Sequence, residues 1–219
     1  MTTADKTTFN SLITTPNPAG PSGVSALINA RTPEQKANLH RRLTDAIRNS
    51  APAIGQYWKG QGGIYAGIIR DGDCQWHLIL VTETTAPGFY QPSDHYSIAH
   101  CAFKGTWGNY PNTIEGEFSR VDGMYNTHLI LASEPDNYLA NAVTSLSIDG
   151  HTDCYWPSQF ENNLLRINLP EHLAPEWHWS STQFSVDTAW GQDFEVGYTL
   201  ILHKGNKRAV RAVRRIPIE

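Results

Sequence analysis

The sequence predicts an α+β domain, because segments typical of strands come before and after two short segments typical of helices. Two β-rich runs, 62–70 and 74–82, are joined by Asp71-Gly72-Asp73, which contains the glycine that a tight hairpin turn needs. Capped helical segments follow these runs, and β-rich runs return near the C-terminus. This grouping favours mixed or antiparallel strands over the regular alternation of strands and helices in a parallel sheet.

Both helices between the strands are predicted from N-cap patterns. The first is expected to begin after Ser133, with Asp136 as the acidic partner of a Ser-x-x-Asp cap, and to continue through YLANAVTSL. The second is expected to follow Ser158, whose capping partner three residues later is Glu161. Its apolar face is predicted to consist of Phe160, Leu164 and Leu165.

The last part of the chain contains four β-rich runs: WHWSSTQFS, AWGQDFEV, YTLILHK and RAVRAVRRI. Gly191, Gly197 and a turn at 204–207 interrupt them. A different composition marks the region 83–120, where Pro, Gly, Asn and Ser are mixed with scattered aromatic residues. This region is predicted to be a long loop or a series of broken strands, a kind of segment that often carries function.

Two segments precede the domain, which is predicted to extend over 54–217. Residues 1–31 are rich in Thr, Pro, Gly, Ser and Asn, which predicts an extended or disordered arm. Residues 32–50 are predicted to form a helix, because Thr32 and Gln35 match a capping box and Pro33 occupies the first helical position. The arm is interpreted equally well as a docking segment and as a leader without a structural role.

Composition and charge limit the classes of partner. The chain has 219 residues and a net charge of −4, which gives no general attraction to nucleic acid or anionic lipid. No apolar run approaches the roughly 20 residues of a membrane-spanning helix, and the N-terminus lacks the pattern of a secretory signal. We therefore expect cytoplasmic synthesis and no membrane insertion. Aromatic residues make up 11% of the chain, which suits a surface that binds sugar or protein.

The sequence contains none of the short motifs of common enzyme classes, such as a P-loop, a G-x-S-x-G elbow or an H-E-x-x-H helix. Cys74, Cys101 and Cys154 are odd in number and widely spaced, so they are predicted to be buried free thiols in a reducing compartment. A thiol-dependent enzyme, with Cys101 or Cys154 beside a histidine, is the least favoured function. We expect no catalytic residue and no cofactor.

Two groups of residues have some of the ligands of a metal site, and neither is predicted to bind a metal. The first is Asp94, His95, His100 and Cys101, which lack the paired ligands typical of structural zinc sites. The second is Glu-Pro-Asp-Asn at 134–137, which resembles the Glu-Pro-Asn tripeptide of calcium-dependent lectins but lacks a Trp-Asn-Asp partner. A helix cap explains this second segment better.

Basic residues are concentrated near the C-terminus: Lys204, Lys207, Arg208, Arg211, Arg214 and Arg215. They form either a strip for an anionic glycan or a set of ion pairs with neighbouring strands, and the second interpretation is slightly favoured. The expected acidic partners are Asp187, Asp193 and Glu195. On one continuous strand, Arg211 and Arg215 would share a face and Arg214 would lie on the other.

Six motifs between 54 and 216, taken in their order and spacing, resemble those of a bacterial and phage family. They are IGQYWKGQGGIYAGI, DGMYNT, DGHTDCYWPSQFENNLL, WSSTQFS, AWGQDF and VRAVRR. The family is the C-terminal domain of a collagen-like bacterial adhesin, the Lcl C-terminal domain, a domain of unknown function related to variable proteins diversified by retroelements. The resemblance implies a C-type-lectin-like fold. The chain departs from the family at 154–158, where CYWPS stands in place of the frequent Trp-Tyr-Leu-Pro-Ser.

The residues of these motifs are assigned structural roles, so that ligands would contact the loops between them. Asp149 and Gly150 are expected to form a turn, and the polar run 180–183 is expected to satisfy buried backbone groups. The predicted core aromatics are Trp179, Trp190 and Phe194.

The sequence and the resemblance together favour a non-catalytic recognition module, encoded by a phage or prophage, that binds a glycan or protein receptor on a cell surface. Candidate contacts are Trp107, Tyr110, Trp177, His178, Gln192 and Asp193, with Lys204, Lys207 and Arg208 for an anionic ligand. Residues 1–50 would attach the module to a virion or to other virion proteins. The competing hypothesis is a structural tail or baseplate protein that assembles as a homo-oligomer such as a trimer.

Overall fold

The computed structural model describes residues 32–35, 37, 38, 41, 51–82, 103–109, 111 and 113–218. The chain divides into two units, Met1–Ala51 and Pro52–Glu219. In the first unit, residues 33–35, 37, 38 and 41 are helical. Thr32 and Gln35 form the predicted capping box, in which each backbone N–H donates to the side-chain oxygen of the other residue at 3.1 Å. The predicted arm and the rest of the predicted helix lie outside the described residues.

The first sheet of the second unit has four strands in the order β1-β2-β3-β9. They are β1 Tyr57–Trp58, β2 Gly63–Asp71, β3 Cys74–Val81 and β9 Val213–Pro217. β2 and β3 form the predicted hairpin, in which Asp71 pairs with Cys74, so the turn itself contains Gly72 and Asp73. Gly72 has a φ of 58°, a conformation that glycine adopts most easily. The C-terminal strand β9 runs antiparallel to β3 and joins the end of the chain to this hairpin.

The second sheet has five strands in the order β4-β8-β5-β6-β7. They are β4 Phe103–Gly105, β8 Arg208–Val210, β5 Trp177–Gln183, β6 Thr188–Asp193 and β7 Thr199–His203. The run RAVRAVRRI is therefore two strands, because β8 belongs to this sheet and β9 to the first. Between them, the buried guanidinium of Arg211 donates to the carbonyl oxygens of His172 and Val81. The expectation that Arg211 and Arg215 share a face of one strand is wrong for this reason.

The described part of the second unit contains helices α4 Gly123–Ser133, α5 Tyr138–Thr144 and α6 Gln159–Asn168, and the 3-10 helix η2 Pro170–His172. α6 begins as predicted, with reciprocal hydrogen bonds between Ser158 and Glu161. The predicted start of α5 is wrong, because Ser133 ends α4 and Asn137 caps α5. Sequence analysis missed α4, whose apolar residues are spread around the helix without a helical period. No helix in the described residues is both long and apolar enough to cross a bilayer.

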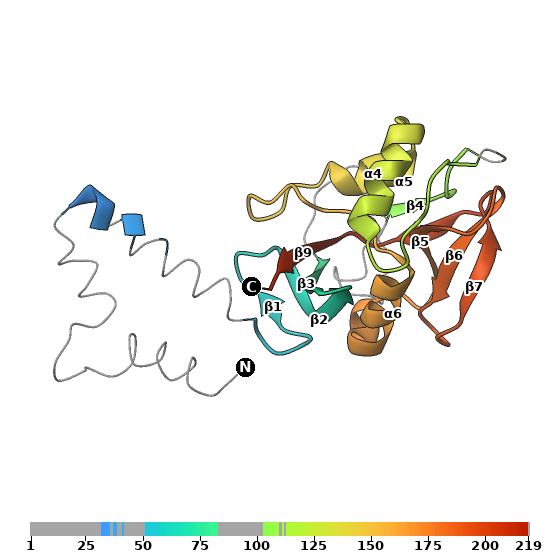
Figure 1. The fold of residues 1–219 in the computed structure, drawn as a ribbon. Coiled ribbons are helices and arrows are strands. Elements are labelled where there is room, and N and C mark those ends of the chain that lie inside the picture. The colour runs from blue at the N-terminus through green and yellow to red at the C-terminus, as the bar shows by residue number, and fades with distance from the viewer. Residues whose placement is uncertain are drawn as a thin grey trace. The chain divides into compact units, whose positions relative to one another are not determined.

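Two apolar clusters hold these elements together, and the predicted α+β class is confirmed. Figure 1 shows α6 between the two sheets and α4 and α5 side by side. The cluster that includes α4, α5 and β5 contains Trp107, Trp156 and Trp179, and the cluster that includes the first sheet and α6 contains Leu78 and Leu165. The indole of Trp156 donates to the backbone oxygen of Trp179 at 3.0 Å, so this ring is fixed as well as buried.

Outcomes for the other motif residues are mostly as predicted. Trp179 and Phe194 are core residues, but Trp190 is partly exposed and its assignment to the core is wrong. Asp149 and Gly150 form a turn with positive φ at both positions. The pairing of β5 with β6 is interrupted at 180–182 and resumes where Gln183 pairs with Ala189, and the side chains of the run bond to backbone atoms as predicted. The hydroxyls of Ser180, Ser181 and Thr182 donate to the carbonyl oxygens of Trp190, Pro157 and Ser119, respectively.

Arg214 of β9 ties the first sheet to the loops that border it. Its buried side chain donates to the carboxylate of Asp153 from Nε at 2.8 Å and from Nη2 at 3.0 Å. Nη1 donates to the backbone oxygen of Gln61 at 3.2 Å, and Nη2 lies 3.0 Å from Nδ1 of His151. Two loop segments, one at Gln61 and one at 151–153, therefore depend on one guanidinium.

We expect Arg214→Ala to lower the free energy of unfolding by about 2 kcal/mol, because it leaves Asp153 and Gln61 without their donor. This is less than the loss for a fully enclosed ion pair, since the Asp153 side chain is 42% exposed and solvent screens its charge. Urea denaturation followed by tryptophan fluorescence measures the change. Arg215→Ala provides a comparison on the same strand, and a wild-type midpoint for Arg214→Ala would contradict the stabilising role.

Candidate functional site

Burial separates the nine candidate ligand contacts into groups. Trp107, His178, Gln192, Asp193 and Lys204 are buried. Trp177 and Arg208 are half-buried, Lys207 is exposed, and Tyr110 lies outside the described residues. The expectation that the five buried residues contact a ligand is corrected by the structure, because none of these side chains is accessible.

Lys204 and Trp107 form one buried contact. The ammonium of Lys204 lies 4.6 Å from the centre of the Trp107 ring and donates to Oε1 of Gln183 and to the backbone oxygen of Val186. Burial lowers the pKa of Lys204 to about 8, although the nearby carboxylates of Glu134 and Asp187 oppose this shift. Lys204 therefore holds the end of β7 in place and is not a free cation for an anionic ligand.

Gln192 and Asp193 shape the turn between β6 and β7. Nε2 of Gln192 donates to the backbone oxygens of Asp193 and Tyr198, at 3.0 and 3.2 Å. Oδ1 of Asp193 accepts from the backbone N–H of Glu195 at 2.8 Å. These hydrogen bonds satisfy backbone groups of a tight turn, which is a structural role.

The basic residues of the C-terminus make ion pairs, as the favoured interpretation predicted, but with other partners. Arg214 pairs with Asp153, and Nη2 of Arg215 donates to Oδ2 of Asp122 at 3.0 Å. Of the expected acidic partners, Asp187 lies close enough to Lys204 to affect its pKa. Trp177 and Arg208 lie on neighbouring strands, each directly before the bridged pair of β5 and β8. Together with the exposed Lys207, they are the candidate ligand contacts within the described residues that have access to solvent.

His178 is a neutral histidine inside the fold. It is fully buried, its Nδ1 lies 3.0 Å from the backbone oxygen of Glu176, and its ring packs 4.5 Å from that of Phe194. Burial lowers the pKa of His178 to about 3, and the positive charges of Arg211 and Lys104 act in the same direction. The ring can therefore accept a proton in the unfolded chain but not in the folded one at mildly acidic pH.

The pKa of His178 predicts acid sensitivity. In the unfolded chain the ring binds a proton below pH 6.5, whereas the folded protein resists protonation until about pH 3, so stability falls as pH decreases between these values. As pH decreases through this range, the free energy of unfolding of wild type should fall relative to that of His178→Phe by up to about 1.4 kcal/mol for each pH unit. Denaturant midpoints measured against pH test this. Leu165→Ala, which removes no titrating group, should show a pH-independent difference.

The metal and thiol hypotheses gain no support from the described residues. Asp94, His95, His100 and Cys101 lie outside them, and within the described ranges no three His, Cys, Asp or Glu side chains group as metal ligands. Cys154 is buried, and burial together with the charge of Asp153 raises the pKa of its thiol to about 12. A thiol with such a pKa is a poor nucleophile at neutral pH.

The segment 134–137, which resembles a calcium-binding tripeptide, is occupied by protein hydrogen bonds. The buried carboxylate of Glu134 accepts from the backbone N–H of Asn109 and from Nδ2 of Asn137 at 3.0 Å. Oδ1 of Asn137 accepts from the N–H of Ala140 and caps α5. The helix-cap interpretation is thus correct in kind, with Asn137 in the place predicted for Ser133.

The raised pKa of the Cys154 thiol predicts slow labelling in the folded protein. A variant with both Cys74 and Cys101 changed to Ser should resist a thiol reagent at mildly alkaline pH, because only about one thiol in ten thousand is ionised four pH units below its pKa. The same variant should react fully in denaturant. A matched variant that retains Cys74, which is exposed, should react in the folded state. Rapid labelling of folded Cys154 would contradict its buried, protonated state.

An exposed aromatic cluster lies where α6 begins beside β5 and β6. Phe184 follows β5 and is 53% exposed, and its ring packs edge-on against that of Trp190, with the ring centres 5.6 Å apart. The guanidinium of Arg120 lies 5.4 Å from the centre of the Trp190 ring. The backbone N–H of Phe160 donates to the backbone oxygen of Arg120 at 2.9 Å. Phe160, which is 42% exposed, therefore lies beside Arg120. We name these four residues the aromatic surface.

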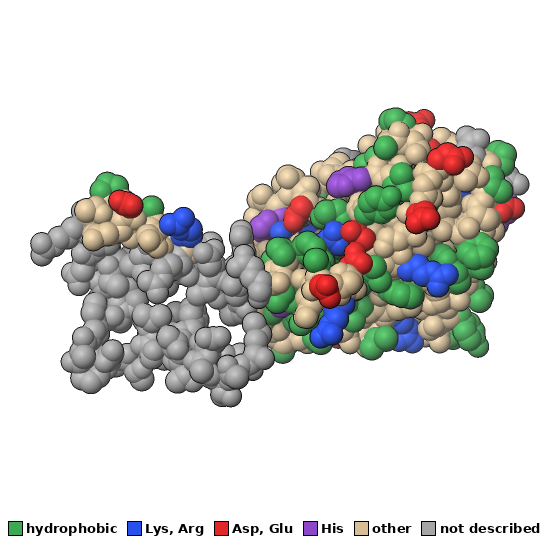
Figure 2. All heavy atoms as spheres, in the orientation of Figure 1, with side chains coloured by type: hydrophobic (Ala, Val, Ile, Leu, Met, Phe, Trp, Pro, Cys, Tyr) green, Lys and Arg blue, Asp and Glu red, His purple; other side chains and the backbone are tan. Residues whose placement is uncertain are grey.

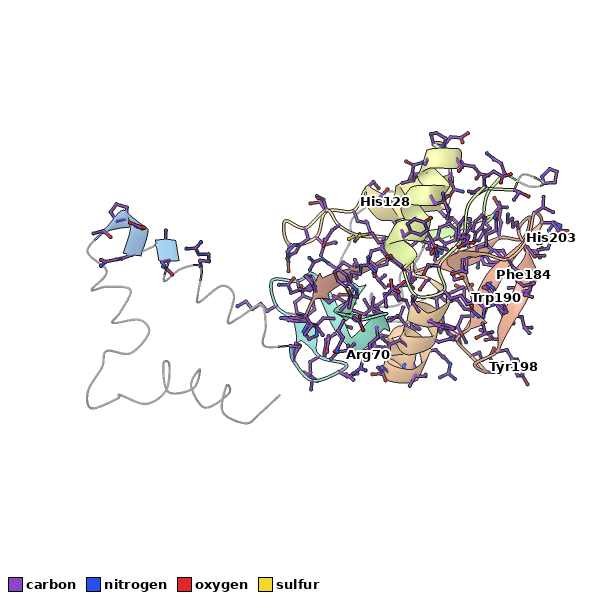
Figure 3. All side chains as sticks on the ribbon, in the orientation of Figure 1. Arg70, His128, Phe184, Trp190, Tyr198 and His203 are labelled. Atoms are coloured by element: carbon purple, nitrogen blue, oxygen red, sulfur yellow. The ribbon has the colours of Figure 1, made fainter. Side chains whose placement is uncertain are left out.

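The figures show how the aromatic surface lies on the fold. Figure 3 places Phe184 and Trp190 next to each other on the side of β5 and β6. On the face shown in Figure 2, hydrophobic side chains border a basic one in the region of α6 and β6. Such a platform offers ring faces for apolar contacts and a guanidinium that donates hydrogen bonds.

No sequence pattern pointed directly to the aromatic surface. The sequence predicts that Phe160 belongs to the apolar face of α6 and that Trp190 is a core aromatic, and both predictions are wrong. The exposed positions follow instead from tertiary contacts: α6 packs on β2, β5 and β6 through residues such as Asn162 and Leu165. A clue was present in Phe184, which follows the polar run 180–183 directly and precedes a turn.

A scan of the chain against models of known protein families finds no match, and a search of the curated proteins finds none either.

Proposed function

We propose that the second unit is a non-catalytic recognition module with a C-type-lectin-like scaffold, which binds a cell-surface glycan through the aromatic surface. The observation that carries this proposal is the exposed contact of Phe184, Trp190 and Arg120. A pyranose ring has an apolar C–H face that packs on an indole or phenyl ring, and its hydroxyls accept hydrogen bonds from a guanidinium. The aromatic surface supplies both kinds of contact side by side.

Support for the scaffold comes from the way the chain closes on itself. β9, near the C-terminus, pairs with the early hairpin strand β3, so that both ends of the second unit meet in one sheet. Many residues of the motifs that resemble the Lcl C-terminal domain are used inside the fold, as Ser158, Glu161 and Thr182 illustrate. Phe160, Phe184 and Trp190 come from the same motifs but have access to solvent. A ligand is then left to side chains at the surface of that scaffold.

The biological setting is part of the same proposal and rests on the resemblance. A phage or prophage origin would make the second unit a receptor-binding module, with residues 1–50 as its attachment to other virion proteins. A protein receptor is the competing ligand, and binding that survives removal of all glycans from a cell envelope would favour it.

We expect Trp190→Ala and Phe184→Ala each to weaken glycan binding about tenfold, since each removes one ring of the platform. A glycan array with the full chain identifies the sugar class, and titration of the best glycan gives the dissociation constants. Trp190→Phe should retain part of the affinity because it keeps an aromatic face.

Tyr125→Ala is the matched control. Tyr125 is an aromatic residue of similar exposure, 48%, on α4 and outside the aromatic surface. The Tyr125→Ala variant should bind the glycan like wild type. The proposal fails if no glycan binds the wild-type protein, or if Trp190→Ala folds normally and binds as well as Tyr125→Ala does.

A further inference from the structure

The aromatic surface continues beyond Trp190 onto the next strand of the second sheet. Trp190 of β6 pairs with Ile201 of β7, and the side chain of Ile201 is 40% exposed. Figure 1 shows these two strands next to each other. Directly paired residues of an antiparallel sheet project from the same face. The apolar platform therefore extends by one strand, from the rings to the side chain of Ile201.

The pair formed by Trp190 and Ile201 is of the kind that brings side chains close together. Where β6 ends, the backbone N–H of Asp193 donates to the backbone oxygen of Tyr198 at 2.8 Å, so these two residues form a bonded pair. Bonded and non-bonded pairs alternate along an antiparallel ladder. Trp190 lies three positions before Asp193, so its pair with Ile201 is non-bonded, with Cα atoms about 4.5 Å apart. The indole and the isoleucine side chain are thus neighbours on one face.

Arg120 lies on the other side of Trp190, near β5. The hydroxyl of Thr182 in β5 donates to the backbone oxygen of Ser119 at 2.9 Å, which holds the next residue, Arg120, near that strand. Because β6 lies between β5 and β7, Arg120 and Ile201 flank Trp190. The row from Arg120 to Ile201 crosses three neighbouring strands, which is about 10 Å at the usual strand spacing.

Helix α6 adds a polar group at the Ile201 end of this row. Thr199 lies two residues before Ile201 and shares its face, and the hydroxyl of Thr199 donates to Oδ1 of Asn163 at 3.0 Å. Asn163 is half-buried, and within the described part of the chain its Nδ2 has no hydrogen-bond partner. The amide can therefore donate to a ligand at this end, as the guanidinium of Arg120 can at the other.

Both ends of the row are open to solvent. Phe160, beside Arg120, is 42% exposed, and β7 is the last of the described strands in the order of this sheet. A long ligand can therefore continue past both ends of the row. A single terminal sugar is usually held in an enclosed pocket that surrounds its hydroxyls, and the flat row from Arg120 to Ile201 has another shape.

We propose that the aromatic surface, extended by Ile201 and Asn163, binds the interior of a carbohydrate chain and not a single terminal sugar. This inference rests on the proposed function. One sugar ring packs on Trp190, the next unit contacts Ile201 and accepts a hydrogen bond from Asn163, and the unit on the other side accepts from Arg120. Each added unit buries further apolar surface, so affinity increases with chain length until the row is filled.

The test titrates the full chain by calorimetry with length ladders, from one to six units, of neutral, N-acetylated and acidic hexose homo-oligomers. Wild type should bind the trisaccharide of its preferred ladder at least about tenfold more tightly than the monosaccharide, with little further gain at six units. Ile201→Ala should weaken trisaccharide binding about fivefold and leave monosaccharide binding unchanged, because a single ring covers only Trp190. Leu200→Ala is the matched control. Leu200 is 49% exposed on the same strand but projects from the opposite face, so this variant should bind every oligomer like wild type.

A second variant tests the polar end of the row without changing the sheet. Asn163→Asp keeps an acceptor for Thr199 but loses the N–H donors, so it should weaken trisaccharide binding about threefold and spare the monosaccharide. Equal affinity at every chain length overturns this inference, and so does a folded Ile201→Ala protein that binds the trisaccharide like wild type. In either case, weakened binding by Trp190→Ala still supports the proposed function. Failure of every ladder to bind wild type overturns both.

Discussion

The carboxylate of Glu161 accepts three hydrogen bonds, two from residues just before α6 and one from the first residue of α4. Oε2 accepts from the backbone N–H of Ser158 at 2.7 Å and of Gly123 at 3.0 Å, and Oε1 accepts from the hydroxyl of Tyr155 at 2.5 Å. The side chain is fully buried, and burial raises its pKa against the effect of these hydrogen bonds. One carboxylate thus joins the beginnings of α4 and α6, and the close approach explains Gly123, where a Cβ would lie 2.5 Å from Oε2.

The same network continues into the last strand. The backbone of Tyr155 pairs with Val213 of β9, and the guanidinium of Arg215 lies 4.3 Å from the centre of the Trp76 ring and bonds to Asp122, the cap of α4. Helix starts, the early hairpin and the C-terminal strand therefore meet around buried or half-buried charges. Because removal of one partner in such a network leaves another buried group unpaired, these residues are constrained by the fold.

This constraint explains which features could be predicted from the sequence. The hairpin at Gly72 and the cap formed by Ser158 and Glu161 depend on residues close in sequence, so their patterns suffice. The start of α5 and the exposure of the candidate contacts depend on partners far along the chain. Trp107 packs in the apolar cluster and its indole donates to the oxygen of Ser180, while Trp190 stays partly exposed. Residue type alone cannot distinguish these two tryptophans, since both suit a core or a binding surface.

The aromatic surface is positioned by backbone contacts and not by its own side chains. The oxygen of Trp190 accepts from Oγ of the buried Ser180 at 2.9 Å, and the N–H of Phe184 donates to the oxygen of Thr188 at 3.0 Å. Arg120 is held through its backbone oxygen in the same way. Side chains at these positions can therefore change without altering the path of the chain, because no hydrogen bond that fixes the backbone uses them. A surface that can vary at little structural cost, on a scaffold that cannot, is what recognition of diverse ligands requires.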